Sequence, residues 1–199
     1  MYCKCNNSYN YQVVGLCDNI SSYDTSKKDS WTQITVPEII TIPECYPDIE
    51  SIERIYISSK VDSVKTIKTP VKASRGLAVP NEEGTLLSGR KLIVHGVICE
   101  TIIYVADNKR QTLHSLNTKN PFCSYIVVPN DSEEIEVENY CVDVCIENVF
   151  AKALNSRVIF KNIALFLKAK KNKSKCIRKT KKGTKVIPVK DNCKGLSDK

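Results

Sequence analysis

The chain has 199 residues, of which 42% are hydrophobic and 26% charged, enough apolar content for the core of one ordinary domain with appended tails. It contains no run of about 18 apolar residues, so we expect no membrane-spanning helix and no membrane partner. The start lacks a basic region followed by an apolar one, so we expect no signal peptide and synthesis in the cytoplasm.

The net charge of +8 is unevenly distributed along the chain. Residues 168–199 contain thirteen lysine and arginine residues and two aspartates, a net charge of +11, which leaves −3 for residues 1–167. Because the body is mildly acidic and no aromatic residue interleaves with the lysines of the tail, we expect no nucleic acid partner. Three interpretations of the tail remain: binding to an anionic polymer, attraction to the acidic body of another copy, and a solvated tail that maintains solubility.

The first predicted elements are an arm and two strands. Residues 1–30 are rich in Asn, Ser, Tyr and Lys and show no sustained periodicity, which predicts an extended arm outside the folded body. From Trp31, the stretch WTQITVPEIITIPECYPDIESI alternates apolar and polar residues, with three prolines that limit the length of any strand. RIYISSKVDSVKTIKTPV continues with β-branched residues at every second position and predicts a further strand.

The strongest strand pattern in the chain is KLIVHGVICETIIYVA. Both of its faces are apolar, with Leu92 and Val94 on one and Ile93 and Val97 on the other, so we expect a central strand covered on both sides. DNKRQ predicts a hairpin turn, and TLHSLNTKNPFCSYIVVP the returning strand. Two more long strands, IEVENYCVDVCIENVFAKAL and SRVIFKNIALFLKAK, flank a turn at Asn155–Ser156.

Short strands separated by turns rich in Gly, Pro and Asn, with almost no helical periodicity, predict an all-β fold. The expected architecture is an antiparallel β-sandwich or a partly open, jelly-roll-like barrel. The predicted division of the chain is an extended cysteine-containing arm (1–30), a β domain (31–168) and a basic cysteine-containing tail (169–199).

The two histidines offer the only hint of catalysis. A nucleophilic pair can be drawn between Cys99 or Cys123 and either His95 or His114, and the predicted hairpin could make the two histidines neighbours. A histidine in a strand is far more often half-buried, with its ring nitrogens hydrogen-bonded, than catalytic. The chain also has no phosphate-binding loop, no GxSxG motif and no spaced carboxylate motif. We predict no enzyme activity, no catalytic residue and no cofactor, and we expect Cys99 to be buried and unreactive.

Cys141, Asp143, Cys145 and Glu147 occupy alternate positions of one predicted strand and therefore point to one face. The apolar residues between them belong to the core, so we expect both cysteines to face outward. Neither their spacing nor that of the two cysteines near the start is typical of a zinc site. A soft thiolate site is the weaker interpretation, and we predict no metal ligand.

The ordered set of motifs resembles a known family. VPEIITIPECYPDIESIERI, GRKLIVHGVICETIIYVAD, LHSLNTKNPFCSYIVVP and NSRVIFKNIALFLKA, in this order after the tryptophan, resemble the SPOCS domain over roughly residues 31–170. SPOCS domains occur in SipL-like spore coat morphogenesis and spore surface proteins of clostridia and related endospore formers. The resemblance implies a β-rich, non-enzymatic domain that acts in spore coat assembly, hence a protein made in the mother-cell cytoplasm and located on the endospore surface.

Ten cysteines are many for a protein made in the cytoplasm, and half of them flank the predicted β domain. They stay reduced during folding, and the spore surface becomes oxidising once the mother cell lyses. We expect the arm to lie on a neighbouring subunit, although thiols that stay free or pair within one chain remain open alternatives. The residues predicted to form intermolecular disulfides are Cys3, Cys5, Cys17, Cys141, Cys145, Cys176 and Cys193.

Two functions follow from these observations. The first is a structural protein that self-assembles head to tail as a homopolymer on the endospore surface, in the coat, the exosporium or an appendage fibre, and is cross-linked by disulfides. The alternative is a non-enzymatic interaction module that recruits another coat morphogenetic protein during sporulation.

Overall fold

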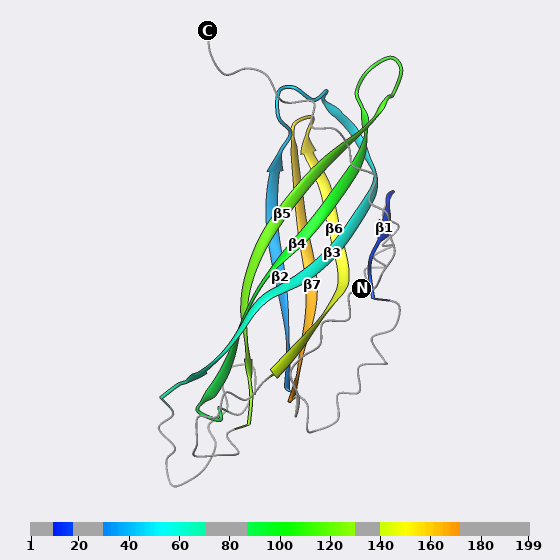
Figure 1. Cartoon of the computed structure of the whole chain (residues 1–199). Helices are drawn as coiled ribbons and strands as arrows, with labels where there is room; N and C mark the ends of the chain where they lie inside the picture. Colours follow the sequence, from blue (N-terminus) through cyan, green and yellow to red (C-terminus); the bar gives the residue numbers. More distant parts are fainter. Residues whose placement is uncertain (1–9, 18–29, 71–86, 130–139, 172–199) are drawn as a thin grey trace, which may run out of the picture.

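The structure is a computed structural model that describes residues 10–17, 30–70, 87–129 and 140–171 (Figure 1). The described residues form strands and turns, with no helix among them, and hence none long and apolar enough to cross a membrane. The strands are β1 (Gln12–Val14), β2 (Ser30–Thr41), β3 (Ile49–Lys68), β4 (Arg90–Ala106), β5 (Leu113–Val127), β6 (Tyr140–Asn155) and β7 (Val158–Lys171).

The strands form two sheets that pack face to face. Sheet A has the order β1-β3-β4-β5, and sheet B has the order β2-β7-β6. All pairings are antiparallel except that of β1, which runs parallel to β3. Because β3 lies over β6 and β2 lies over β5, the central strands β4 and β7 face each other across the core. The predicted all-β fold is confirmed as a sandwich; the sheets do not close into a barrel.

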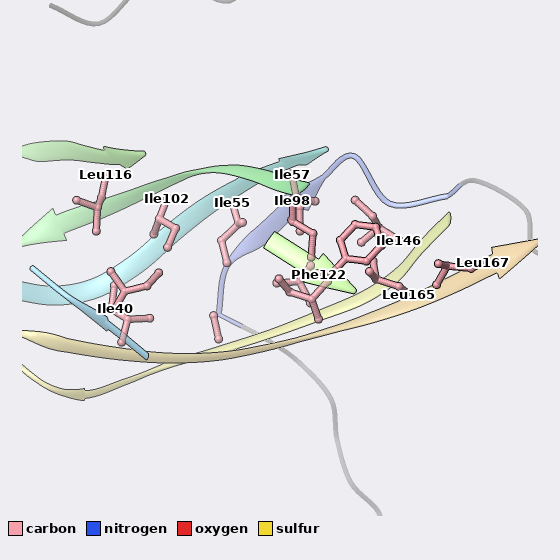
Figure 2. Close-up of a cluster of buried hydrophobic side chains, with 14 of the residues drawn as sticks. Ile40, Ile55, Ile57, Ile98, Ile102, Leu116, Phe122, Ile146, Leu165 and Leu167 are labelled. Carbon is pink, nitrogen blue, oxygen red and sulfur yellow. The ribbon is translucent and has the colours of Figure 1, made fainter. Parts of the chain in front are cut away.

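The core forms from the inward positions of the alternating strands. β4 contributes Leu92, Val94, Ile98 and Ile102, which are at most 1% exposed, and β7 contributes a matching row of aliphatic side chains. Figure 2 shows Ile98 and Ile102 of β4 and Leu165 and Leu167 of β7 among the side chains between the two sheets. Burying one such aliphatic side chain contributes roughly 1.5–3 kcal/mol, so this layer is the main source of the stability of the sandwich.

The outer face of β4 differs from the prediction. Ile93, Val97, Cys99 and Ile103 are half-buried, because a two-layer sandwich covers only one face of each sheet. The expectation that β4 is covered on both sides is therefore wrong, and so is the expected burial of Cys99. An apolar stripe is left along the outer face of sheet A.

The prolines mark edges and a crossover between the sheets. Pro37 in β2 and Pro121 in β5 lie in strands at the edges of their sheets, where a missing N–H does not break a central ladder.

After β2 the chain turns and crosses to sheet A. Arg157, in the β6–β7 turn, holds this crossover: its Nη1 donates to Tyr46 O at 2.6 Å, and its Nε lies 2.9 Å from Asp48 Oδ1.

Candidate functional site: the N-terminal segment and its cysteines

The N-terminal segment, residues 10–17, occupies the opening between the two sheets on the side of β3 and β6 (Figure 1). β1 pairs with β3 and so extends sheet A. Cys17 N donates to Ile146 O at 3.0 Å, so the same segment also bonds to β6, the edge strand of sheet B. The exposed edge of β6 is covered in this way, which removes a site for unwanted strand pairing.

Tyr11 fixes the segment to β6 with its hydroxyl group. This group accepts a hydrogen bond from Ala151 N at 2.7 Å and donates one to Val149 O at 3.2 Å. The aromatic ring, together with Val13 and Leu16, packs against the core cluster. Residues 10–17 therefore belong to the folded body, whereas the sequence pattern begins that body at Trp31.

Cys17 forms a disulfide with Cys145 of β6, with 5.7 Å between the Cα atoms. The register places Cys145 opposite Phe166, and its neighbour Ile146 opposite the core residue Leu165, so Cys145 faces away from the core as predicted. It is nevertheless fully buried. For Cys17 and Cys145 the structure thus gives a bond within one chain, in place of the predicted intermolecular bonds.

Cys141, two outward positions before Cys145, is half-buried and also disulfide-bonded. Between the two cysteines, Asp143 forms an ion pair of 2.8 Å with Lys170 on the same outer face. The remaining predicted cross-linking residues, Cys3, Cys5, Cys176 and Cys193, lie outside the described residues, as does the basic tail beyond Lys171. Intermolecular bonds from these four cysteines stay a prediction.

The histidines lie apart on the hairpin of β4 and β5. His95 is opposite Cys123 on the exposed outer face, whereas His114 is opposite Tyr104 and its ring stacks on that tyrosine with 5.8 Å between centroids. The structure thus places His95 and Cys123, one of the cysteine–histidine pairs considered from the sequence, opposite each other. It does not place the two histidines side by side. Within the described ranges, no group of three or more His, Cys, Asp or Glu residues is placed to hold a metal ion.

Gly15 allows the N-terminal segment to approach β3. Its φ is +114°, and a Cβ there would lie 2.0 Å from Ile57 O. We predict that Gly15→Ala weakens the binding of this segment to the sandwich by about 1–3 kcal/mol. The alanine would be strained at this φ, and its Cβ would clash with Ile57 O unless the segment moved away. A reductant should then open the Cys17–Cys145 bond of the native protein faster. Val14→Ala, which shortens an exposed side chain of β1, is the control expected to leave the rate nearly unchanged.

A second group of polar residues lies inside the sandwich and was missed by sequence reasoning. Lys161 of β7 is fully buried and contacts Glu100 of β4, Glu38 of β2 and Thr118 of β5. The available signal was the break in alternation: Glu38 and Lys161 occupy inward positions of otherwise apolar rows. Burial raises the pKa of the Glu100 carboxyl group, and the hydrogen bond and charge of Lys161 offset part of this rise.

Comparison with protein families identifies the sandwich. The family model described as "SipL, SPOCS domain" matches residues 48–154, just over half of the chain. The chain belongs to the SPOCS domain family. The match runs from the turn before β3 almost to the end of β6, so this SPOCS chain has Cys145 inside the matched region and the N-terminal segment before it. Comparison with curated proteins and with solved structures found no match.

Membership in the SPOCS family gives the chain a sporulation-related spore coat role and a spore-associated location. It confirms the resemblance carried by the ordered motifs of β3, β4 and β5. The stretch that begins at Trp31 forms β2, and the stretch NSRVIFKNIALFLKA forms most of β7. Both strands belong to sheet B.

Proposed function

We propose that this SPOCS protein is a structural, self-assembling protein of the endospore surface, whose subunits are joined by intermolecular disulfides. The observation that carries the proposal is where the sulfur chemistry lies. The described core cluster contains no cysteine, whereas Cys141 and Cys145 lie on the outer face of sheet B and both form disulfides. Because cysteines of this outer face form disulfides in the folded chain, we extend the same chemistry to bonds between subunits.

The two outer faces of the sandwich support self-association. Sheet B exposes Ile39 of β2 at 66% and Leu154 of β6 at 56%, and the rings of Phe150 in β6 and Phe160 in β7 lie with their centroids 6.1 Å apart. Sheet A carries the apolar stripe of β4 on the opposite side of the molecule. Stacking sheet B of one copy on sheet A of the next would bury both surfaces. Such a contact joins two different faces and therefore repeats head to tail without closing.

Strand edges contribute less to this assembly. β2 and β5 each carry a proline, which disfavours the addition of a further strand at that side of the sandwich. We therefore propose that faces associate first and that cysteines outside the described residues, among Cys3, Cys5, Cys176 and Cys193, then lock the contact. The role is non-enzymatic. The partners are other copies of the chain and other spore coat proteins, with neither a membrane nor a nucleic acid.

The alternative function is an interaction module that recruits a different coat morphogenetic protein through the same exposed faces. Non-reducing electrophoresis of material from mature spores separates the two functions. A ladder of this chain that collapses with reductant supports the structural protein, whereas a monomer that co-purifies with another coat protein supports the module.

Images of negatively stained purified protein test the contact directly. Wild-type protein should form filaments or sheets, and Ile39→Lys should prevent them without unfolding the sandwich, because this side chain is mostly exposed. Asn108→Lys, in the exposed β4–β5 turn, is the control expected to assemble normally. Equal assembly by both variants would show that the contact between subunits does not involve the outer face of sheet B.

A further inference from the structure

The buried polar group around Lys161 has the components of a reactive site. The side chains of Lys161 and Glu100 are both fully buried and in direct contact across the core. Glu38, directly opposite Lys161 on β2, brings Oε2 to 2.7 Å from Nζ, although in an orientation that makes no regular hydrogen bond. Thr118, directly opposite Glu100 on β5, accepts a hydrogen bond from Nζ at 3.3 Å.

A buried ion pair is a link between two sheets with a high cost in desolvation free energy. Removing two charges from water costs several kcal/mol for each ion, and the mutual attraction offsets this only when every remaining polar atom is paired. Here Glu100 Oε1 is buried without a hydrogen-bond partner. One lysine also faces two carboxyl groups, so the pocket has an excess of acid. Burial raises the pKa of the Glu100 carboxyl group, which favours a carboxylic acid beside the amine.

A neutral amine held against a neutral carboxylic acid is the reactant pair for amide formation. The structure positions the two groups from the central strands of opposite sheets, so neither can move away without opening the core. Fixed proximity of this kind removes a large part of the activation free energy of a bond-forming reaction. Glu38 supplies the second requirement. Its side chain is 21% exposed, so it lies between the buried amine and solvent and can transfer protons.

We propose that Lys161 and Glu100 form an intramolecular isopeptide bond, with Glu38 as the proton-transferring catalytic residue. A proton first moves from the ammonium group of Lys161 to the carboxylate of Glu100. The free Nζ then attacks Cδ of Glu100, and the N–C bond forms. Glu38 takes a proton from the nitrogen and delivers it to the departing oxygen. The C–O bond breaks, one water molecule leaves, and Glu38 returns to its starting state.

The step is balanced without any oxidant, reductant or other reactant. The ammonium and carboxylate groups become a secondary amide and water, with no change in net charge. Two buried charges disappear, which removes the desolvation cost of the pair. The product links β4 to β7, so the two sheets become covalently joined through their central strands. This inference does not depend on the proposed function, because it concerns a bond within one chain.

Intact mass spectrometry of the reduced and unfolded full-length chain tests the proposal. After prolonged incubation in the folded state, the wild-type chain should weigh less than its sequence by the mass of one water molecule. Peptide mapping should find the peptide containing Lys161 joined to the peptide containing Glu100, with no tryptic cleavage after Lys161. A folded wild-type chain with its full sequence mass would overturn the proposal.

Variants assign the roles of the residues. Lys161→Arg and Glu100→Ala should retain the full mass, and Glu38→Gln should form the bond at least about 100-fold more slowly, as expected for loss of a general acid–base group. Lys60→Arg changes an exposed lysine that pairs with Asp62, and should still lose one water. Loss of water at the wild-type rate in Glu38→Gln would exclude Glu38 from the reaction. Loss of water in Lys161→Arg would show that the modification lies elsewhere.

Discussion

Replacing Cys145 with serine should lower the free energy of unfolding by about 2–5 kcal/mol. The bond to Cys17 closes a loop between residues that are 128 positions apart, and a cross-link over so long a loop strongly restricts the unfolded chain. It also holds the N-terminal segment in the opening between β3 and β6. Urea denaturation of the oxidised protein, followed by circular dichroism, measures the change.

Two further variants make this result specific. Cys17→Ser and the double variant should lose about as much as Cys145→Ser, because all three remove the same bond. Cys123→Ser alters an exposed residue of β5 that forms no disulfide, and should change the free energy of unfolding by less than about 0.5 kcal/mol. A Cys145→Ser protein as stable as the wild type would show that the N-terminal segment holds its position by hydrogen bonds and packing alone.

The second large effect is expected inside the core. Relative to wild-type chains in which the amide has not formed, Glu100→Leu should lower the free energy of unfolding by at least about 3 kcal/mol, because it leaves the fully buried Lys161 with only Glu38. Lys161→Met should be similarly costly, because it leaves the Glu100 carboxyl group without its cation. The double variant should be more stable than either single one, since an apolar pair needs no compensation in an apolar core.

Lys60→Met is the matched control for charge removal. Lys60 pairs with Asp62 at 2.8 Å, but both side chains are largely exposed, so its replacement should cost less than about 1 kcal/mol. Urea denaturation midpoints for the four variants provide the comparison. A double variant no more stable than the singles would contradict the account of Lys161 and Glu100 as mutually dependent buried groups.

Sequence patterns predicted the long strands well because alternation extends over many residues in each of them. The hairpin turn after β4 and the turn between β6 and β7 lie where the sequence predicted them. The N-terminal segment could not be found in this way. β1 has three residues and gains its stability from contacts with two sheet edges, so it leaves no periodic pattern in the sequence.

The candidate site shows the same limit. The alternation in β6 correctly predicts that Cys145 faces outward, but it does not reveal which segment covers that face. Pairing of Cys17 with Cys145 depends on β6 being an edge strand, which is a property of the whole sheet order. Similarly, Glu38 and Lys161 each look like isolated errors in an apolar row until the topology places them opposite each other and next to Glu100.

The proposed covalent assembly is tested most directly by isotope mixing. Equal amounts of unlabelled and ¹⁵N-labelled protein would be mixed as reduced subunits, assembled, oxidised and digested without reductant. The Cys17–Cys145 peptide should be entirely light or entirely heavy, because that bond forms within one chain. Peptides containing Cys3, Cys5, Cys176 or Cys193 should include mixed pairs of one light and one heavy partner. If every disulfide-linked peptide is isotopically uniform, the subunits are not cross-linked by disulfides.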